Sequence, residues 1–162
     1  MALTGFDIWR LEGITSMPTH FAPEGTSVTY VKGAVLIQTS GYTAEAGANP
    51  TNVIGVAAHA GKNLTTHPRG FYTPPDDSVI FVGSLDTGAG EGTGTVAAAD
   101  LGAEYGITKT GLTTSGQTGR WYVDQNKTGA DARVRVVELI DAVGTVQGRC
   151  GFKFLTAAKA IA

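Results

Sequence analysis

The chain has 162 residues and a formal net charge of −2, which suits one domain and offers no basic surface for nucleic acid. Its 23 glycines are about twice the usual share, and only 16% of its residues are charged. Threonine and valine are also abundant, and both favour strands over helices. The composition therefore predicts a mostly β protein with many turns, and the sparse charge predicts contacts with other polypeptides.

Residues 1–25 are predicted to form an extended N-terminal arm. Large apolar side chains cluster near the start (Phe6, Ile8, Trp9 and Leu11), and the Gly- and Pro-bearing stretch that follows is expected to hold no strand or helix. Such side chains must be buried on their own domain or on a neighbouring molecule, and the low surface charge favours the neighbour. Charged residues interrupt this start, so a signal peptide is not indicated, and no run approaches the ~20 apolar residues of a membrane span.

Residues 26–155 read as one β-rich domain. In its first half, strands are expected at "SVTYV", "AVLIQT", "NVIGVAAHA" and "SVIFVGSL", with turns at Lys32-Gly33 and Ser40-Gly41. The last of these strands is continuously apolar, so both of its faces are expected to be buried. Three prolines fall within residues 61–77, which are predicted to be a loop without any regular element.

The second half of the domain begins with a glycine-rich loop, "DTGAGEGTGT", whose two acids and lack of a βαβ context argue against a phosphate site. "VAAADLGAEYGI" is the one predicted helix, a short one ended by Gly102 or Gly106. A strand at "RWYVDQ" precedes a long hairpin, "ARVRVVELI" and "VQGRCGFKF", joined by the turn "DAVGT". Residues 156–162 are interpreted as a C-terminal tail with little to fold around.

These elements predict an all-β fold with one short helix. The expected architecture is an antiparallel β-barrel or sandwich, or a β-tulip-like variant of it, with the extended arm attached. No sequence period repeats, which excludes a solenoid. The single cysteine, Cys150, cannot form an internal disulfide, and its alternation with Phe152 and Phe154 places it on the buried face of the hairpin.

The sequence holds no recognisable catalytic motif. The only metal site that can be imagined combines His59 and His67 with Asp76 or Asp77, but the histidines lie eight residues apart, across a glycine and in a loop. The two adjacent acids are predicted to form the turn that begins a buried strand, and His59 to lie where a strand leaves the core. We therefore expect no enzymatic activity, no cofactor and no metal; an enzyme using these residues stays as an alternative that predicts bound metal.

Two long stretches carry a resemblance to a known family. The order "SVTYVKGAVLIQTSGYTAEAGANPTNVIGVAAHAGKN" resembles the N-terminal part of tailed-phage head decoration, or capsid cement, proteins. The stretches "ADLGAEYGITK", "GRWYVDQ" and "ARVRVVELIDAVGTVQGRCGFKFL" are similar to the later half of such proteins, where a "DxxGT" turn joins two long strands. The resemblance covers roughly residues 26–155 and rests on turns and strands rather than on catalytic signatures.

The resemblance implies a structural virion protein, often a homotrimer, that is made in the host cytoplasm and binds the outer surface of an icosahedral capsid. Its partner would be the major capsid protein, with no nucleic acid, membrane, cofactor or catalysis involved. On this interpretation Phe6, Ile8, Trp9 and Leu11 anchor the protein on the shell or on a sister subunit, and Arg10 pairs with a capsid carboxylate.

Two alternatives remain open at the level of sequence. The chain could be another virion component, such as a head fibre or a minor capsid protein. It could instead be a carbohydrate-binding sandwich that uses aromatic stacking platforms. The candidate platforms are Trp121, Tyr122, Phe71 and Tyr72.

Overall fold

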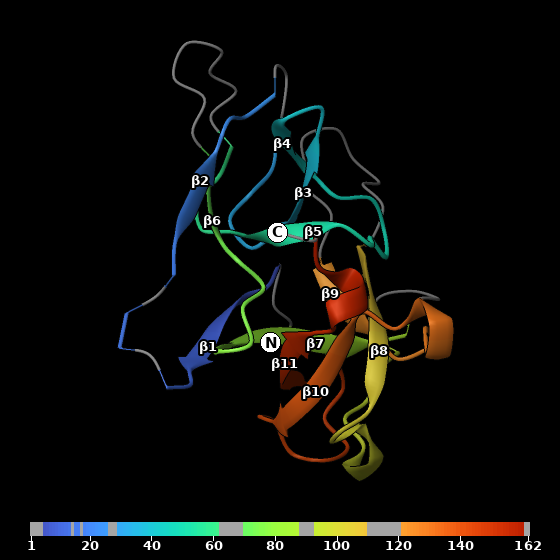
Figure 1. Ribbon diagram of the computed structural model, residues 1–162. Coiled ribbons are helices and arrows are strands. Elements are labelled where there is room, and N and C mark those ends of the chain that lie inside the picture. Colours follow the sequence, from blue (N-terminus) through green and yellow to red (C-terminus); the bar gives the residue numbers. More distant parts are fainter. Residues whose placement is uncertain are drawn as a thin grey trace.

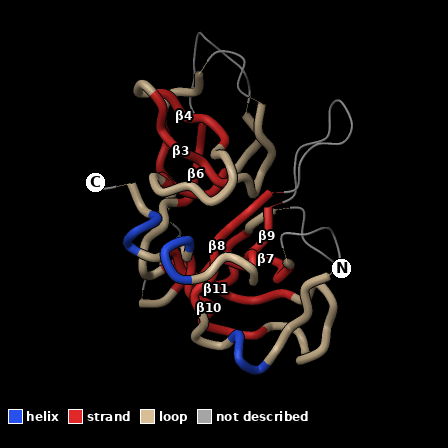
Figure 2. The backbone as a smooth tube through the Cα atoms, turned by 90° about the vertical axis from the view of Figure 1, so that its right-hand side faces the viewer, coloured by secondary structure: helices blue, strands red, loops and turns tan. Residues whose placement is uncertain are grey.

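The computed structural model describes most of the chain. The described residues are 5–13, 15–16, 18–25, 29–61, 70–87, 93–109 and 121–160. Within them, the predicted all-β fold is confirmed: eleven strands form two sheets, and the only helical elements are short 3₁₀ turns. Figures 1 and 2 show the two sheets as two layers stacked along the long axis of the molecule.

The larger sheet contains a closed barrel, which we call barrel A. Its six strands are β1 (Asp7–Leu11), β7 (Val79–Asp86), β8 (Glu104–Lys109), β9 (Trp121–Asp124), β10 (Val134–Leu139) and β11 (Arg149–Phe154). The sheet order is β1-β7-β11-β10-β8-β9, and a short parallel pairing of β7 with β9 closes the last five strands of that order into a ring. Strand β1 is the extra strand, attached antiparallel to β7 outside the ring.

Strand β7 is the centre of barrel A. Every one of its eight residues is buried, as its continuous apolar run predicted, because it carries neighbours on both edges and packs on both faces. The largest fully buried side chains around it are aromatic, including Phe81, Phe152 and Trp121. Edge-to-face contacts among such rings hold this core together.

The smaller sheet, sheet B, has the order β2-β6-β5-β3-β4. Its strands are β2 (His20–Ala22), β3 (Val35–Thr39), β4 (Tyr42–Glu45), β5 (Val53–Ala57) and β6 (Gly70–Thr73). The chain that leaves β2 runs on to the far edge of the sheet, where Glu24 pairs with Thr43 of β4 in a parallel bridge. Residues 20–25 thus join the two edges of sheet B, so that neither edge ladder is left wholly open.

The two layers are connected at both ends of the chain. At the N-terminal end, the amide of Phe6 donates to the carbonyl of Gly33 at 2.9 Å, and the amide of Gly33 donates to the carbonyl of Ala57 at 2.8 Å. At the C-terminal end, the 3₁₀ turn η3 (Thr156–Ala158) is followed by a parallel bridge between Lys159 and Val53 of β5. The expectation of a tail with nothing to fold around is wrong for residues 156–160, because Ala158 is fully buried.

The predicted helix over residues 96–107 is also wrong in most of its length. Only η1 (Ala98–Asp100) is helical, as a single 3₁₀ turn, and residues from Glu104 onward form β8. Gly102 adopts φ +84°, which ends the turn and redirects the chain into the barrel. A second 3₁₀ turn, η2 (Gly129–Asp131), precedes β10. Among the described residues, no helix is both long and apolar enough to cross a bilayer.

Two strands lie where none was expected. Strand β6 falls inside the predicted loop 61–77, and β2 falls inside the Gly- and Pro-bearing part of the arm. Both are short: β2 pairs with β6, and β6 pairs with β2 and β5, so neither strand carries a local pattern of its own. Conversely, residues 29–31 of the expected strand "SVTYV" form no strand, while residues 26–28, 62–69 and most of the glycine-rich loop lie outside the described part.

Candidate functional site

The expected arm is in fact part of the folded domain over residues 6–11. Phe6 is 2% exposed, and its ring lies edge-on to Phe152 of β11 with 4.8 Å between the centroids. Ile8 and Leu11 are half-buried against the same core. Burying these apolar groups inside the chain's own barrel removes the need for a neighbour, so the interpretation of Phe6 as an exposed anchor is wrong.

Trp9 and Arg10 are the two predicted anchor residues that stay exposed. The register of β1 against β7 shifts between Ile8 and Arg10, so that Trp9 is the extra residue of a β-bulge. A bulge bends its strand and re-aims the side chains next to it, and here both Trp9 and Arg10 face outward. The indole N–H of Trp9 donates to Oε2 of Glu138 at 3.2 Å, and the guanidinium of Arg10 lies 3.5 Å from the same oxygen.

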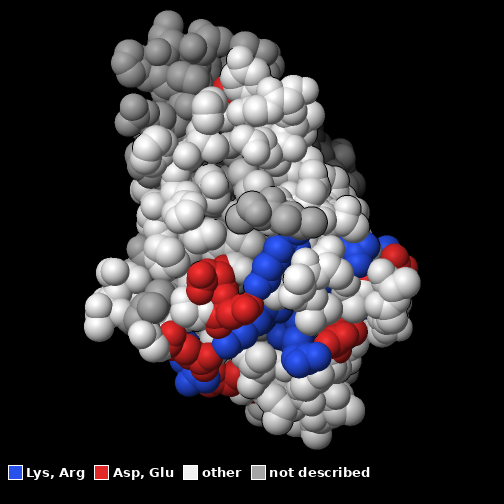
Figure 3. All heavy atoms as spheres, in the orientation of Figure 1, with Lys and Arg blue, Asp and Glu red and all other residues white. Residues whose placement is uncertain are grey.

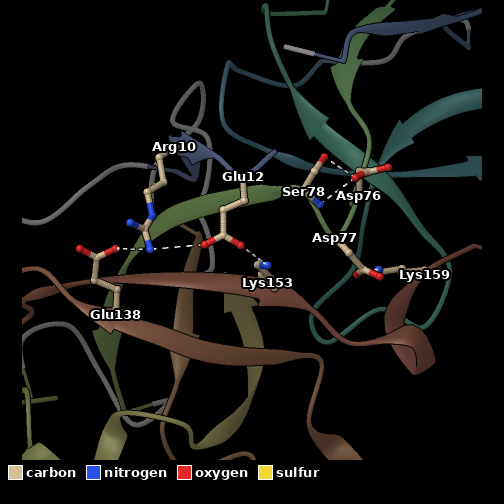
Figure 4. A network of polar contacts seen from close by, with 8 residues as sticks. All are labelled: Arg10, Glu12, Asp76, Asp77, Ser78, Glu138, Lys153 and Lys159. Carbon is tan, nitrogen blue, oxygen red and sulfur yellow. Dashed lines mark hydrogen bonds and ion pairs between the residues drawn. The ribbon is translucent and has the colours of Figure 1, made fainter. Parts of the chain in front are cut away.

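These residues belong to a set of ion pairs on the outer wall of barrel A, which we call the charged belt. The charged belt comprises Arg10, Glu12, Glu104, Arg135, Glu138 and Lys153. Figure 4 shows four of them, Arg10, Glu12, Glu138 and Lys153, and Figure 3 shows acidic and basic side chains side by side over barrel A. Nζ of Lys153 lies 2.6 Å from Glu12, Arg10 lies 3.4 Å from Glu12, and Arg135 pairs with Glu104 across β10 and β8.

The charged belt is internally neutral, with three acids and three bases. Two of its pairs, Lys153 with Glu12 and Arg135 with Glu104, join residues that lie far apart in the sequence. The hydrogen bond from Lys153 is the main reason that the pKa of Glu12 lies below its usual value. Exposed pairs of this kind contribute little to stability. The belt therefore offers a polar surface without a net field.

Sheet B, by contrast, is almost free of charge. Among the residues of its five strands, Glu45 is the only Asp, Glu, Lys or Arg and His20 the only histidine, and Glu45 accepts the indole N–H of the buried Trp121 at 2.8 Å. Of the aromatic side chains that the structure describes on this sheet, Phe21 and Tyr42 are exposed, at 60% and 51%. Figure 3 shows the contrast for the described residues: Lys, Arg, Asp and Glu gather over barrel A, while the described part of the sheet B end is nearly bare of them on this face. We call this surface the uncharged end.

A second surface, at the opposite end of the molecule, exposes aliphatic side chains beside the ion pair of Asp141 with Arg149. There, η1 and the turn after β10 lie side by side, because the amide of Val96 donates to Thr145 and the amide of Gly144 donates to Val96. Leu101, Val143 and Val146 are each more than half exposed on these turns. We call this surface the barrel tip. It contributes three separate aliphatic side chains but no exposed aromatic ring.

His59 lies two residues beyond the end of β5, as the sequence predicted for a strand that leaves the core. It is exposed and lines a hollow of about 220 Å³ together with Phe6, Ile8 and Lys32. His67, its imagined partner, lies outside the described residues. In the part of the chain that the structure describes, no three His, Cys, Asp or Glu side chains come together as a metal site would require.

Asp76 has a structural role in the turn before β7. Its carboxylate accepts hydrogen bonds from the amide and the hydroxyl of Ser78, and these bonds lower its pKa. Asp77 pairs with Lys159 of the C-terminal segment (Figure 4). The predicted turn at these two acids is confirmed, and both carboxylates are engaged in holding it.

The stacking platforms of the carbohydrate-binding alternative are mostly absent. Trp121 is fully buried and Tyr122 is 4% exposed, so neither ring can meet a sugar. The side chain of Phe71 lies outside the described part. Tyr72 is half-buried and lines a groove on sheet B. The prediction is wrong for the two residues of β9, because β9 is buried on both faces.

Sequence reasoning missed four buried carboxylates among the described residues: Glu24, Asp86, Asp100 and Asp124. Asp86 accepts from the amide of Gly94 at 3.0 Å and from the side chain of Gln147 at 2.8 Å. Asp100 accepts a hydrogen bond from the hydroxyl of Tyr105 at 2.7 Å. The pKa of Tyr105 is raised, mainly by burial of the side chain and secondly by this hydrogen bond. Such contacts fasten turns to the end of barrel A, and no local sequence signal distinguishes them from surface acids.

Comparison with models of protein families, with curated proteins and with solved structures finds no match to this chain. The geometry itself therefore defines the class: an all-β protein of two stacked sheets, in which a neutral charged belt separates an uncharged end from an apolar barrel tip.

Proposed function

We propose that the protein is a structural component of a tailed-phage virion that binds the outer surface of the capsid and bridges its subunits. The sequence resemblance over residues 26–155 suggests this class. The structural observation that carries the proposal is the uncharged end, where Phe21 and Tyr42 are exposed on strands whose only Asp, Glu, Lys or Arg is Glu45. Exposed aromatic residues on an uncharged surface are typical of an interface core.

A cement protein acts through mass action. It binds the assembled shell better than free capsid subunits, so each bound copy shifts the equilibrium towards the shell. Many copies at symmetric positions convert modest contacts into a large total effect. A contact surface without charge suits this task, because its attraction is screened little by salt.

The anchors differ from those that the sequence alone suggested. Phe6, Ile8 and Leu11 are committed to the core of barrel A. Trp9 and Arg10 remain available, but Glu138 already engages both of them, so moving them to a capsid partner would break existing contacts. We therefore assign the main contact with the shell to Phe21 and Tyr42, and a peripheral contact to Trp9 and Arg10.

Co-sedimentation with expanded, empty capsids of the phage that encodes the chain tests the proposal. The wild-type protein should pellet with the capsids. Replacing both Phe21 and Tyr42 by Ser should lower occupancy at least about tenfold, because truncating aromatic anchors commonly costs 2 kcal/mol or more. Val143→Ser is the matched control, since Val143 is 62% exposed but lies at the barrel tip. No pelleting of the wild type would overturn the proposed function.

Two further readouts separate the parts of the proposal. If Val143→Ser abolishes binding and the double variant does not, the barrel tip is the contact surface and the assignment to sheet B is wrong. The mass in solution, measured by sedimentation, tests the homotrimer: three times the chain mass of 16.7 kDa is expected if trimers form before binding.

A further inference from the structure

A groove on sheet B has features that the proposed function does not use. It consists of two adjoining hollows, of about 260 Å³ and about 500 Å³. Gln38 of β3 and Ala160 of the C-terminal segment line both hollows, so the two are continuous. The combined space is within the size range of small-molecule sites.

One aromatic ring is fixed at one end of this groove. Tyr72 of β6 and His20 of β2 are register partners, and their rings meet edge to face with 5.9 Å between centroids. The ring of Tyr72 also lies over Gly55 of β5, where a Cβ atom would approach it to 2.6 Å. Three neighbouring strands (Figure 1) therefore hold the tyrosine in place, which lowers the entropy that a ligand must remove on stacking.

The rest of the groove carries polar groups but little charge. Its polar lining comes mainly from the amides of Gln38 and Asn52 and the hydroxyls of Thr51 and Thr156. Among its described lining residues, Lys159 is the only Lys, Arg, Asp or Glu, and its ammonium is paired with Asp77; His20 packs its ring against Tyr72. The groove therefore lacks the free cation that a phosphate, sulfate or carboxylate ligand would require.

We propose that this groove binds a neutral oligosaccharide. The apolar C–H face of a sugar ring can stack on Tyr72, while amides and hydroxyls supply the paired donors and acceptors that sugar hydroxyls need. Ile54, Pro74 and Pro75 add apolar walls beside the ring. This inference does not depend on capsid binding, because neither Phe21 nor Tyr42 lines the groove and sugar binding requires no shell.

The test uses the intact ¹⁵N-labelled chain titrated separately with maltotriose, cellotriose and chitotriose, and with trigalacturonate as the acidic comparison. At least one neutral trisaccharide should shift the amides of residues 51–54 and 72, with a dissociation constant on the order of 1 mM for so open a groove. Trigalacturonate should cause no such shifts. Silence from all three neutral sugars, or equal binding of the acid, would overturn the inference.

Variants locate the binding. Tyr72→Ala should weaken it about tenfold, the effect of losing one stacking ring, and Tyr72→Phe should retain it because the ring remains. Tyr42→Ala is the matched control: it removes another exposed tyrosine of sheet B outside the groove. If Tyr72→Ala does not fold, Asn52→Ala replaces it, because Asn52 is an exposed lining residue of the groove. The Asn52→Ala variant should bind the sugar at least a few-fold more weakly. Undiminished binding in the folded variants would refute the assignment.

Discussion

The indole N–H of Trp9 donates a hydrogen bond to Oε2 of Glu138 across two intervening strands of the sheet. Both residues stand at irregularities, Trp9 in the bulge of β1 and Glu138 just after the register shift of β10. Between them lies Gly151 of β11, where a Cβ atom would come within 3.2 Å of Cβ of Glu138 and 3.7 Å of Trp9. A residue without a side chain thus lets the indole reach the carboxylate, and the N-terminal strand is fastened to the outer wall of barrel A.

The two aromatic residues of this N-terminal segment should differ in their effect on stability. Phe6→Ala is expected to lower the free energy of unfolding by about 3–5 kcal/mol, because it empties a site in contact with Phe152. Trp9→Ala should cost less than half as much, since Trp9 is 42% exposed. Urea unfolding followed by circular dichroism measures both. If both variants lost the same small amount of unfolding free energy, Phe6 would have to be exposed in solution, as on an arm.

The misplaced arm shows what sequence reasoning could and could not reach. Phe6, Ile8 and Leu11 were correctly recognised as side chains that must be covered, but their cover lies more than seventy residues away, on β7. The strongly patterned hairpin of β10 and β11 was predicted because its alternation is local. Strands β2 and β6 were missed because they owe their structure to each other.

The candidate surfaces were predictable to a lesser degree. Sparse charge was visible in the composition, but its concentration on sheet B depends on how the strands pair. Trp121 looked like a platform because a four-residue strand with two aromatics resembles an exposed one, and only the closure of barrel A by β7 and β9 buries it. A functional surface can therefore be predicted only when the fold is known, because the fold decides which side chains are exposed.

Two glycines outside the turns give a matched test of sheet B. Gly55→Ala should destabilise the protein by about 1–3 kcal/mol, because its Cβ would stand 2.2 Å from the carbonyl oxygen of Thr73. Gly47→Ala meets nothing within 4 Å and should be neutral or stabilising by up to about 1 kcal/mol through the unfolded state. Thermal and urea unfolding of both variants provides the check. Similar stabilities would mean that β5 and β6 lie further apart than described.

The ion pair at the hairpin turn makes stability depend on acid. Arg149 donates hydrogen bonds to both carboxylate oxygens of Asp141. These bonds are the main reason that the pKa of this carboxyl falls to about 2. Because the folded pKa lies below the unfolded one, the stabilisation is full above about pH 4 and disappears as the pH falls to about 2.

Asp141→Asn should therefore destabilise the protein at pH 7 and make no difference at about pH 2. The expected loss is about 1 kcal/mol, because Arg149 is 40% exposed and solvent screens the pair. Urea unfolding at the two pH values measures it. A loss of the same size at both would assign the role of Asp141 to the shape of the turn instead of its charge.

Neighbouring alanines test whether the C-terminal segment fastens the two layers together. Ala158 is fully buried beside β5, whereas Ala157 is exposed on the same 3₁₀ turn. Ala158→Asp would place a carboxylate in an apolar site and should cost at least about 2 kcal/mol, while Ala157→Asp should stay within about 0.5 kcal/mol of wild type.

The amide of Ala160 donates a hydrogen bond to the carbonyl of Val53. Displacing the C-terminal segment should therefore also speed hydrogen exchange along β5 before it affects β7. Uniformly faster exchange in both sheets would show that the segment supports the whole fold and not only the junction of the two layers. If the two variants were equally stable, the segment would not be docked on β5 in solution.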